Sequence, residues 1–170
     1  MKSIFSYRGI YFICLLLAVL TLGTSYYLEN YLGIMPCALC ILQRFVMIIL
    51  AVVFLLGFIL YLSRRWHHIF DSLAIFFSGL GILLAGRQVW LQTLPPLQNT
   101  DCGVSLNYLL QVMPWDQALR KIFQGSAECS LVTWQFLHLS LAQWSLIAFA
   151  MFFVISIIQF TRKVTEKTPR

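Results

Sequence analysis

Four long apolar stretches constrain the fold of this 170-residue chain more than any other feature of its sequence. They run from about residues 10 to 27, 40 to 62, 69 to 91 and 141 to 160. Each is long enough, or nearly so, to cross a bilayer, which requires about 20 helical residues. Charged residues make up 11% of the chain and its mean hydropathy is +0.82, whereas an ordinary globular domain carries about 25% charged residues. The sequence therefore predicts an all-α membrane protein, a four-transmembrane-helix bundle in a single domain.

The first stretch has an alternative interpretation as a cleaved signal peptide. Gly23-Thr24-Ser25 resembles the small-x-small pattern of a cleavage site. Cleavage there would leave three spans and would put the two ends of the mature chain on opposite sides of the membrane. We treat the stretch as a retained span, and the family resemblance described below supports that choice.

The basic residues indicate how the four spans are oriented. If the spans alternate in direction, eight of the twelve Lys and Arg residues fall on one side, namely Lys2, Arg8, Arg64, Arg65, Arg162, Lys163, Lys167 and Arg170. The positive-inside rule places this side, residues 1–9, 63–68 and 161–170, in the cytoplasm. The loops of about residues 28–39 and 92–140 then lie on the outer side. The net charge of +6 is a signal of topology, because no basic stripe with interleaved aromatic residues indicates nucleic-acid binding.

This orientation brings four of the five cysteines to the outer side: Cys37, Cys40, Cys102 and Cys129. Cysteines that face an oxidising compartment, with none in the cytoplasmic segments, are typical of disulfides. The fifth, Cys14, lies within the first span, where we expect it to pack as a small apolar residue.

Cys37 and Cys40 form a C-x-x-C motif where a polar turn runs into the second span. A thiol at the start of a helix is stabilised as the thiolate by the helix dipole and by a nearby cation. Arg44 supplies such a cation, since it lies four residues after Cys40 and shares its helix face. An arginine slightly inside the membrane edge is costly and is usually functional. The alternative role for Arg44 is an interfacial anchor that extends to the lipid headgroups.

The long outer loop of about residues 92–140 carries the other two cysteines, and loops of this length are usually functional. Within it, Pro114-Trp115 begins a short amphipathic stretch that ends at Gly125. One face presents Trp115, Leu119, Ile122 and Phe123, and another presents Asp116, Gln117, Arg120, Lys121 and Gln124. This pattern predicts a short helix lying on the membrane surface. The alternative is a loop helix that packs against its own domain.

Three interpretations of the four outer cysteines are open. A zinc site is disfavoured because Cys102 and Cys129 lie 27 positions apart, where a second metal knuckle would hold them within a few residues. Purely structural disulfides are disfavoured because a C-x-x-C disulfide closes almost no loop. A redox relay accounts for both pairs and for their common side. None of His67, His68 and His138 is predicted as a metal ligand, so no metal is expected.

These features together resemble the bacterial DsbB family of disulfide bond formation proteins. The resemblance is carried by the segment Pro36-Cys37-Ala38-Leu39-Cys40-Ile41-Leu42-Gln43-Arg44, by four spans, and by a long outer loop with two spaced cysteines. Trp134-Gln135-Phe136-Leu137 and Gln143-Trp144 also look like the family's entry into its last helix. The similarity covers nearly the whole chain, and it implies a bacterial inner-membrane protein whose active cysteines face the periplasm.

The resemblance implies a role for each outer cysteine. Cys102 would form the mixed disulfide with DsbA, a soluble periplasmic oxidase that resembles thioredoxin, and Cys129 would be its partner in the loop. Cys129 would exchange with Cys37, and Cys40 would be the thiolate next to a membrane quinone, either ubiquinone or menaquinone. Arg44 would help to bind that quinone.

Some positions depart from the family pattern or align only loosely. Gln43 stands where many members have a carboxylate, so we assign it no role, and Leu141-Ala142 stands where Met-Pro is often found. Arg87 and Gln88 are further candidates for contact with the quinone headgroup.

Two other functions remain as alternatives to a quinone-dependent thiol oxidase. One is a non-catalytic membrane adaptor whose cysteines only staple the outer loop. The other is an enzyme resembling vitamin K epoxide reductase, although that family has its membrane C-x-x-C near the last span.

Overall fold

The computed structural model describes residues 7–33, 37–60, 64–93, 114 and 135–165. Its helices within these ranges are α1 (Tyr7–Leu32), α2 (Ala38–Ile59), α3 (Arg64–Thr93) and α7 (Leu141–Thr165). All four are long and apolar enough to cross a membrane, which confirms the predicted four-helix fold. The amphipathic helix predicted after Pro114 lies outside the described residues, as do Cys102 and Cys129.

The apolar stretches form helices because lipid offers the backbone no hydrogen-bond partners. A helix satisfies its own N–H and C=O groups, so it is one of the few structures that can cross a bilayer. None of the five prolines lies within the four helices, so no proline removes a backbone donor from them.

The bounds of all four helices differ from the predicted spans by a few residues. Helix α3 begins at Arg64, so most of the expected cytoplasmic turn of residues 63–68 is helical. Helix α2 ends at Ile59, with Leu60 as its C-cap, rather than at residue 62. Helix α3 has 30 residues, about 45 Å at 1.5 Å per residue, whereas the hydrocarbon core is about 30 Å thick. Hydropathy identifies the part of a helix that lies in lipid, while backbone hydrogen bonding continues beyond it.

A two-residue hairpin precedes the last helix, at a place where we predicted only the entry into that helix. Strand β1 (Gln135–Phe136) pairs in antiparallel fashion with β2 (Leu139–Ser140). Both turn residues, Leu137 and His138, have positive φ angles, of 54° and 64°. Such turns normally use Asn-Gly or a similar pair, so Leu-His gave no signal of a hairpin. Within the described residues this is the one departure from an all-α fold.

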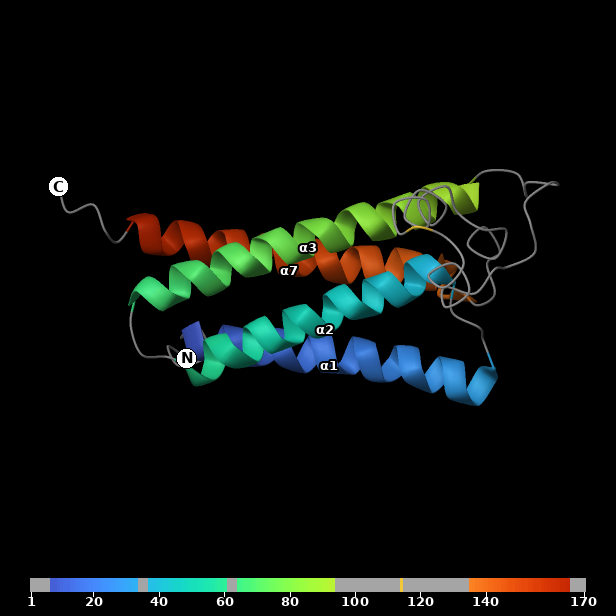
Figure 1. Cartoon of the computed structure of the whole chain (residues 1–170), viewed down its shortest axis with the longest axis horizontal. Coiled ribbons are helices and arrows are strands. Elements are labelled where there is room, and N and C mark those ends of the chain that lie inside the picture. Colours follow the sequence, from blue (N-terminus) through green and yellow to red (C-terminus); the bar gives the residue numbers. More distant parts are fainter. Residues whose placement is uncertain (1–6, 34–36, 61–63, 94–113, 115–134, 166–170) are drawn as a thin grey trace.

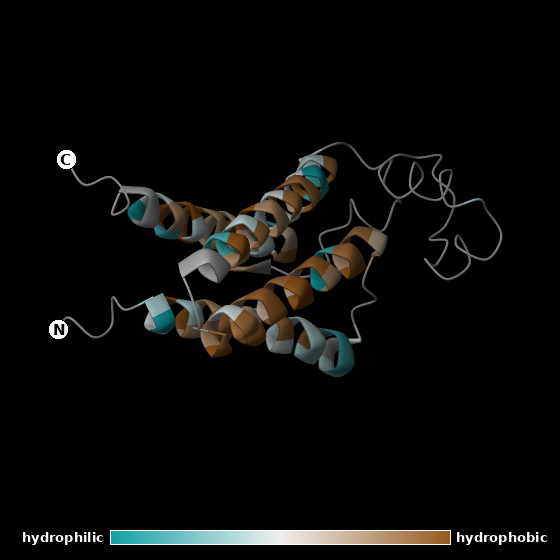
Figure 2. Cartoon of the chain, turned by 60° about the vertical axis from the view of Figure 1, so that its left-hand side comes forward, coloured by the Kyte–Doolittle hydropathy of each residue, from teal (hydrophilic) through white to brown (hydrophobic). Residues whose placement is uncertain are grey.

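Helices that follow one another along the chain pack together: α1 packs mainly on α2, α2 on α3, and α3 on α7. Helix α1 begins and α7 ends at the same end of the bundle (Figure 1). Hydrophobic residues line the helices, and hydrophilic residues gather toward the helix ends (Figure 2). Large apolar side chains also cover the outside of the bundle, for example Leu83 at 70% exposure and Phe45 at 61%. Such an outer surface fits a lipid environment.

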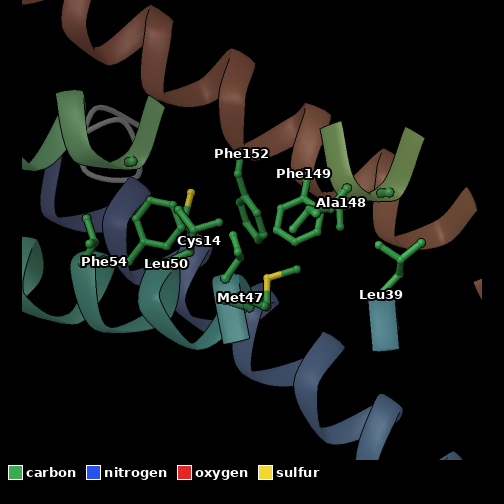
Figure 3. Packing of buried hydrophobic residues seen from close by; sticks show 14 of the residues in the cluster. Cys14, Leu39, Met47, Leu50, Phe54, Ala148, Phe149 and Phe152 are labelled. Carbon is green, nitrogen blue, oxygen red and sulfur yellow. The ribbon is translucent and has the colours of Figure 1, made fainter. Parts of the chain in front are cut away.

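The core is formed by buried residues of all four helices. Phe149 and Phe152 of α7 point toward Leu50 of α2 and are fully buried (Figure 3). Gly81 of α3 admits Phe149, because a Cβ atom added there would lie 2.3 Å from Phe149 Cδ1. Cys14 is 1% exposed and belongs to this core, which confirms its predicted packing role.

A buried polar pair joins two helices near the end of the bundle that carries the start of α1. The Tyr11 hydroxyl of α1 donates a hydrogen bond to the Asp71 carboxylate of α3. The two residues are 3% and 1% exposed. Gly57 of α2 makes room for the tyrosine ring, since a Cβ atom added there would lie 2.7 Å from Tyr11 Cε1.

Candidate redox site

The C-x-x-C motif lies at the start of α2, at the opposite end of the bundle from the Tyr11–Asp71 pair. Cys37 is the N-cap, with an extended backbone conformation, and its carbonyl accepts a hydrogen bond from the Ile41 N–H at 3.1 Å. Cys40 therefore lies in the first turn of the helix. The two Sγ atoms are 3.1 Å apart. Cys37 is buried and Cys40 is half-buried.

This spacing suits disulfide chemistry. A disulfide has an S–S bond of about 2.05 Å, so the two sulfur atoms need to approach by only about 1 Å to form one. The orphan N–H groups at the start of α2 and the helix dipole favour negative charge at this position. The first turn of α2 therefore holds a dithiol where its thiolate form is stabilised.

Gln88 of α3 contacts both sulfur atoms. Its side-chain Nε2 donates to Cys40 Sγ at 3.1 Å and to Cys37 Sγ at 3.6 Å. Gln88 is 4% exposed, so these contacts are made away from water. Gln88, which we named only as a further candidate for quinone contact, therefore lies against the dithiol.

Gln43 of α2 completes this cluster. Its Nε2 donates to Gln88 Oε1 at 2.6 Å, and Gln43 is 5% exposed. We assigned Gln43 no role from the sequence; in the structure its amide bonds the residue that contacts both cysteines. A glutamine on an apolar helix, one turn after a cysteine, was the signal that could have identified it.

Arg44 points toward α1. Its Nε–H donates to Ser25 Oγ at 2.7 Å and its Nη2 to the Ser25 carbonyl at 3.2 Å. Its Nη1 forms an ion pair with the Glu29 carboxylate, and its guanidinium lies 5.1 Å from the centroid of the Tyr26 ring. The Arg44 side chain is only 16% exposed. These contacts are with protein, so they argue against an anchor that extends to the headgroups.

Glu29 and Ser25 were not singled out from the sequence as site residues. The available signal was an acidic residue near the end of the first span, at the same membrane depth as an arginine near the start of the second. Opposite charges at one depth on antiparallel neighbouring helices can pair, and pairing lowers the cost of burying each.

The Arg87 side chain lies against Trp90, whereas the side chain of its neighbour Gln88 contacts the dithiol. Its guanidinium lies 4.3 Å from the centroid of the Trp90 ring, and Trp90 is 54% exposed. A cation over an exposed tryptophan suits the membrane interface.

The start of α7 is tied to the end of α3 beside this cluster. Ser140 and Gln143 form a capping box: the Ser140 N–H donates to Gln143 Oε1 at 2.8 Å, and the Gln143 N–H donates to Ser140 Oγ at 3.4 Å. The Ser140 hydroxyl also donates to Gln92 Oε1 at 2.7 Å. The Trp144 indole N–H donates to the Phe136 carbonyl at 3.2 Å, which holds the hairpin against α7.

Comparison with known proteins identifies the family. The model of the family described as "Disulfide bond formation protein DsbB" matches residues 7–159. The chain is a member of the DsbB family. Among its relatives, "Disulfide bond formation protein B" of Acinetobacter baylyi is 38% identical over 95% of this chain and 98% of the relative. The protein of the same name from Marinobacter nauticus is 34% identical over 94% and 95%.

A third relative, "Disulfide bond formation protein B 1" of Pseudomonas aeruginosa, is 35% identical over 92% of this chain and 96% of its own length. DsbB-family membership over nearly the whole chain favours disulfide bond formation over both a passive adaptor and an enzyme resembling vitamin K epoxide reductase. It also agrees with the retained first span, because the family match begins at residue 7.

Proposed function

We propose that this DsbB-family chain is a quinone-dependent thiol oxidase that reoxidises a periplasmic DsbA-like dithiol oxidase and passes the electrons to membrane quinone. The observation that carries the proposal is the Cys37–Cys40 dithiol itself. Its sulfur atoms are 3.1 Å apart at the start of a helix able to span a membrane. A reactive dithiol at the edge of a bilayer can exchange electrons with both a soluble protein and a lipid-soluble acceptor.

The net reaction balances in electrons and protons. A reduced partner dithiol gives up two electrons and two protons and becomes a disulfide. A quinone supplies the oxidising power by accepting two electrons and two protons to become a quinol. The protein returns to its starting state after each turnover.

The transfer between the two cysteine pairs is thiol–disulfide exchange. In the proposed order, a partner thiolate attacks the Cys102–Cys129 disulfide at Cys102, and the released Cys129 thiolate attacks the Cys37–Cys40 disulfide at Cys37. Each attack forms one S–S bond and breaks another. The second attack releases Cys40 as a thiolate. The partner's second thiolate then displaces Cys102, which releases the partner as a disulfide, and the Cys102 thiolate attacks the Cys129–Cys37 disulfide at Cys129. This last exchange restores the Cys102–Cys129 disulfide and leaves a Cys37–Cys40 dithiol for the quinone to reoxidise. The roles of Cys102 and Cys129 rest on the family resemblance, since both lie outside the described residues.

The side chains around the dithiol are chemically suited to a quinone. Arg44 provides a partly buried cation one helical turn after Cys40, and its bonds to Ser25 and Glu29 hold it in place. A fixed cation stabilises negative charge that develops on a carbonyl oxygen in a site of low dielectric. The guanidinium carries five N–H groups, and its hydrogen bonds within the described residues use three of them. We propose that Arg44 contacts a quinone carbonyl, whether the quinone is ubiquinone or menaquinone.

The proposed location is the bacterial inner membrane, with the dithiol end of the bundle facing the periplasm and both termini in the cytoplasm. The distribution of basic residues supports this orientation. Exchange with a soluble partner requires the two outer loops to face the compartment that contains that partner.

Purified full-length protein in detergent or nanodiscs tests the proposal. A reduced DsbA-type oxidase and a soluble ubiquinone or menaquinone analogue are added, and quinone absorbance and partner thiols are followed together. We expect one quinone to be reduced for each partner disulfide formed. Partner oxidation without quinone reduction, or neither, would favour a structural role for the cysteines.

A further inference from the structure

Two buried amide groups and the half-buried Cys40 thiol form a continuous hydrogen-bonded chain across α2 and α3. The Gln43 amide donates to the Gln88 carbonyl oxygen at 2.6 Å, and the Gln88 amide donates to Cys40 Sγ at 3.1 Å. The same Gln88 nitrogen lies 3.6 Å from Cys37 Sγ. A neutral glutamine thus makes a polar side-chain contact with both sulfur atoms.

We propose that Gln88 is a catalytic residue that stabilises the thiolate of the Cys37–Cys40 pair, and that Gln43 is a positioning residue that orients Gln88. The inference rests on the proposed thiol-oxidase function and adds two residues to it. Neither role follows from the C-x-x-C motif or from Arg44.

The role of Gln43 follows from the two ends of a glutamine side chain. The Gln88 amide has a donor NH2 group and an acceptor oxygen, and only the donor end can bond an anionic sulfur. Gln43 donates to the oxygen of Gln88, which turns the NH2 group toward the cysteines. Without that bond, the Gln88 amide could rotate by 180° and place its oxygen against the sulfur atoms.

The contacts of Arg44 show why a second donor is needed. Its three nitrogen atoms bond Ser25 and Glu29 of α1, and the Glu29 carboxylate balances its charge. The guanidinium is therefore hydrogen-bonded to residues of α1, whereas the Gln88 NH2 group donates to the sulfur atoms of the two cysteines. A hydrogen bond to a charged acceptor is about twice as strong as one between neutral groups. Burial of Gln43 and Gln88, at 5% and 4% exposure, removes competing water.

The hydrogen bond from Gln88 stabilises some chemical states of the dithiol more than others. The Gln88 bond is strongest to a thiolate and weaker to a thiol or a disulfide, so it favours the ionised form. The thiolate is the nucleophile in disulfide exchange, and it is also the form that gives up electrons most readily. The amide chain therefore supports both halves of the proposed reaction without adding a charge to the membrane.

The test measures the pH dependence of alkylation in full-length protein with Cys14, Cys102 and Cys129 replaced by serine. Iodoacetamide reacts with the thiolate, so the initial rate reports the ionised fraction of the dithiol independently of quinone and partner. The variants are Gln88→Met and Gln43→Met, because methionine matches the unbranched length of glutamine but donates no hydrogen bond. Gln159→Met is the matched control: Gln159 is also a buried glutamine, at 3% exposure, and lies on α7 near the opposite end of the bundle.

We expect Gln88→Met to move the half-maximal rate to higher pH by about one unit, which corresponds to about 1.4 kcal/mol. Gln43→Met should give a smaller shift in the same direction, and Gln159→Met should match the parent protein. An unshifted Gln88→Met profile would overturn the inference, because Gln43 acts only through Gln88, and so would an equal shift for Gln159→Met. If Gln88→Met does not fold, the Gln43→Met profile decides alone.

Failure of the proposed function gives a different result. In that case protein with all five cysteines reduces no quinone in the presence of a reduced partner, whatever the alkylation profiles show. If that protein is active and the Gln88→Met profile coincides with the parent profile, only the role of Gln88 is wrong.

Discussion

The two ends of the bundle both bury polar side chains, but they bury them with different partners. At one end, Tyr11 and Asp71 bond each other across α1 and α3. At the other, Gln43 bonds Gln88, and Gln88 bonds the sulfur atoms of the two cysteines. Those sulfur atoms change from thiols to a disulfide during the proposed reaction. We call these regions the Tyr11–Asp71 end and the dithiol end. A polar group bonded to an unchanging partner stabilises a fold, whereas one bonded to a reactive atom changes the energy of a reaction.

The ion pair at the dithiol end extends this contrast. Arg44 and Glu29 are 16% and 32% exposed, so they lie closer to water than Tyr11 and Asp71 do. A charged pair near the membrane edge can reorganise around a ligand, while a pair buried between helices cannot do so without disturbing the packing. The comparison therefore predicts that substitutions at the dithiol end change chemistry and those at the Tyr11–Asp71 end change stability.

The largest expected effect concerns which end faces which compartment. A reporter that is active only in the cytoplasm should be active when fused after Arg170 or inserted near Arg65, and silent when fused near Gly125. The physical reason is the excess of basic residues at the Tyr11–Asp71 end. An active reporter near Gly125 would reverse the two ends and remove the periplasmic role of the dithiol.

The next largest effect is loss of turnover. Replacing Cys37 or Cys40 with serine should reduce quinone turnover to the background rate, because no disulfide can form at the membrane edge. Cys102→Ser or Cys129→Ser should stop partner oxidation but leave a Cys37–Cys40 dithiol that quinone still oxidises.

The control for the cysteine variants is Cys14→Ser, which should leave turnover unchanged because Cys14 lies in the core. The measurement is quinone absorbance together with mass spectrometry of trapped cysteines. Normal turnover by the Cys102→Ser protein would contradict the two-pair relay.

Arg44→Met should have an intermediate effect. We expect the apparent KM for quinone to rise about tenfold to a hundredfold, because a lost hydrogen bond to a charged group is worth about 1.5–3 kcal/mol. Arg44→Lys keeps the charge but lacks the planar fork, so its KM should lie between those of the parent and Arg44→Met. Both are measured by quinone titration with saturating partner thiol.

Arg87→Met is the matched control for Arg44, since its guanidinium lies over Trp90. It should leave the KM for quinone unchanged. An unchanged KM for Arg44→Met together with a raised KM for Arg87→Met would move the quinone site to the Trp90 side of α3.

The smallest expected effect lies at the Tyr11–Asp71 end. Tyr11→Phe should lower the free energy of unfolding by about 1–3 kcal/mol, because it removes a hydrogen bond from a buried carboxylate. At temperatures where the variant is folded, its turnover and its KM for quinone should equal those of the parent. Denaturant unfolding in detergent and the quinone assay together check this, and a raised KM with unchanged stability would contradict the division between the two ends.

Several parts of this molecule follow from local sequence. The four spans follow from apolar length, since a helix in lipid needs no partner to satisfy its backbone. The place of the dithiol also follows, because a C-x-x-C motif before an apolar run must lie at the start of a helix. The packing of Cys14 as a small apolar residue also follows, from its position within a span.

Other parts depend on what lies across from a residue. Gln88 touches the cysteines although 48 positions separate it from Cys40, and Glu29 pairs with Arg44 because α1 packs on α2. The Leu137-His138 turn has positive φ angles without glycine or asparagine, and its hairpin is held by the bond from Trp144 to Phe136. The spacing of residues along the chain does not predict these contacts.

The sequence by itself therefore determined that this chain makes four membrane helices with a reactive dithiol near an arginine, because hydropathy and motif spacing are local properties. Only the tertiary structure decided which polar groups meet that dithiol. Amide and carboxylate side chains on apolar helices need partners, and the partner of each depends on the rotation and depth of neighbouring helices. In this bundle that packing directs Arg44 toward Glu29 and Gln88 toward the sulfur atoms.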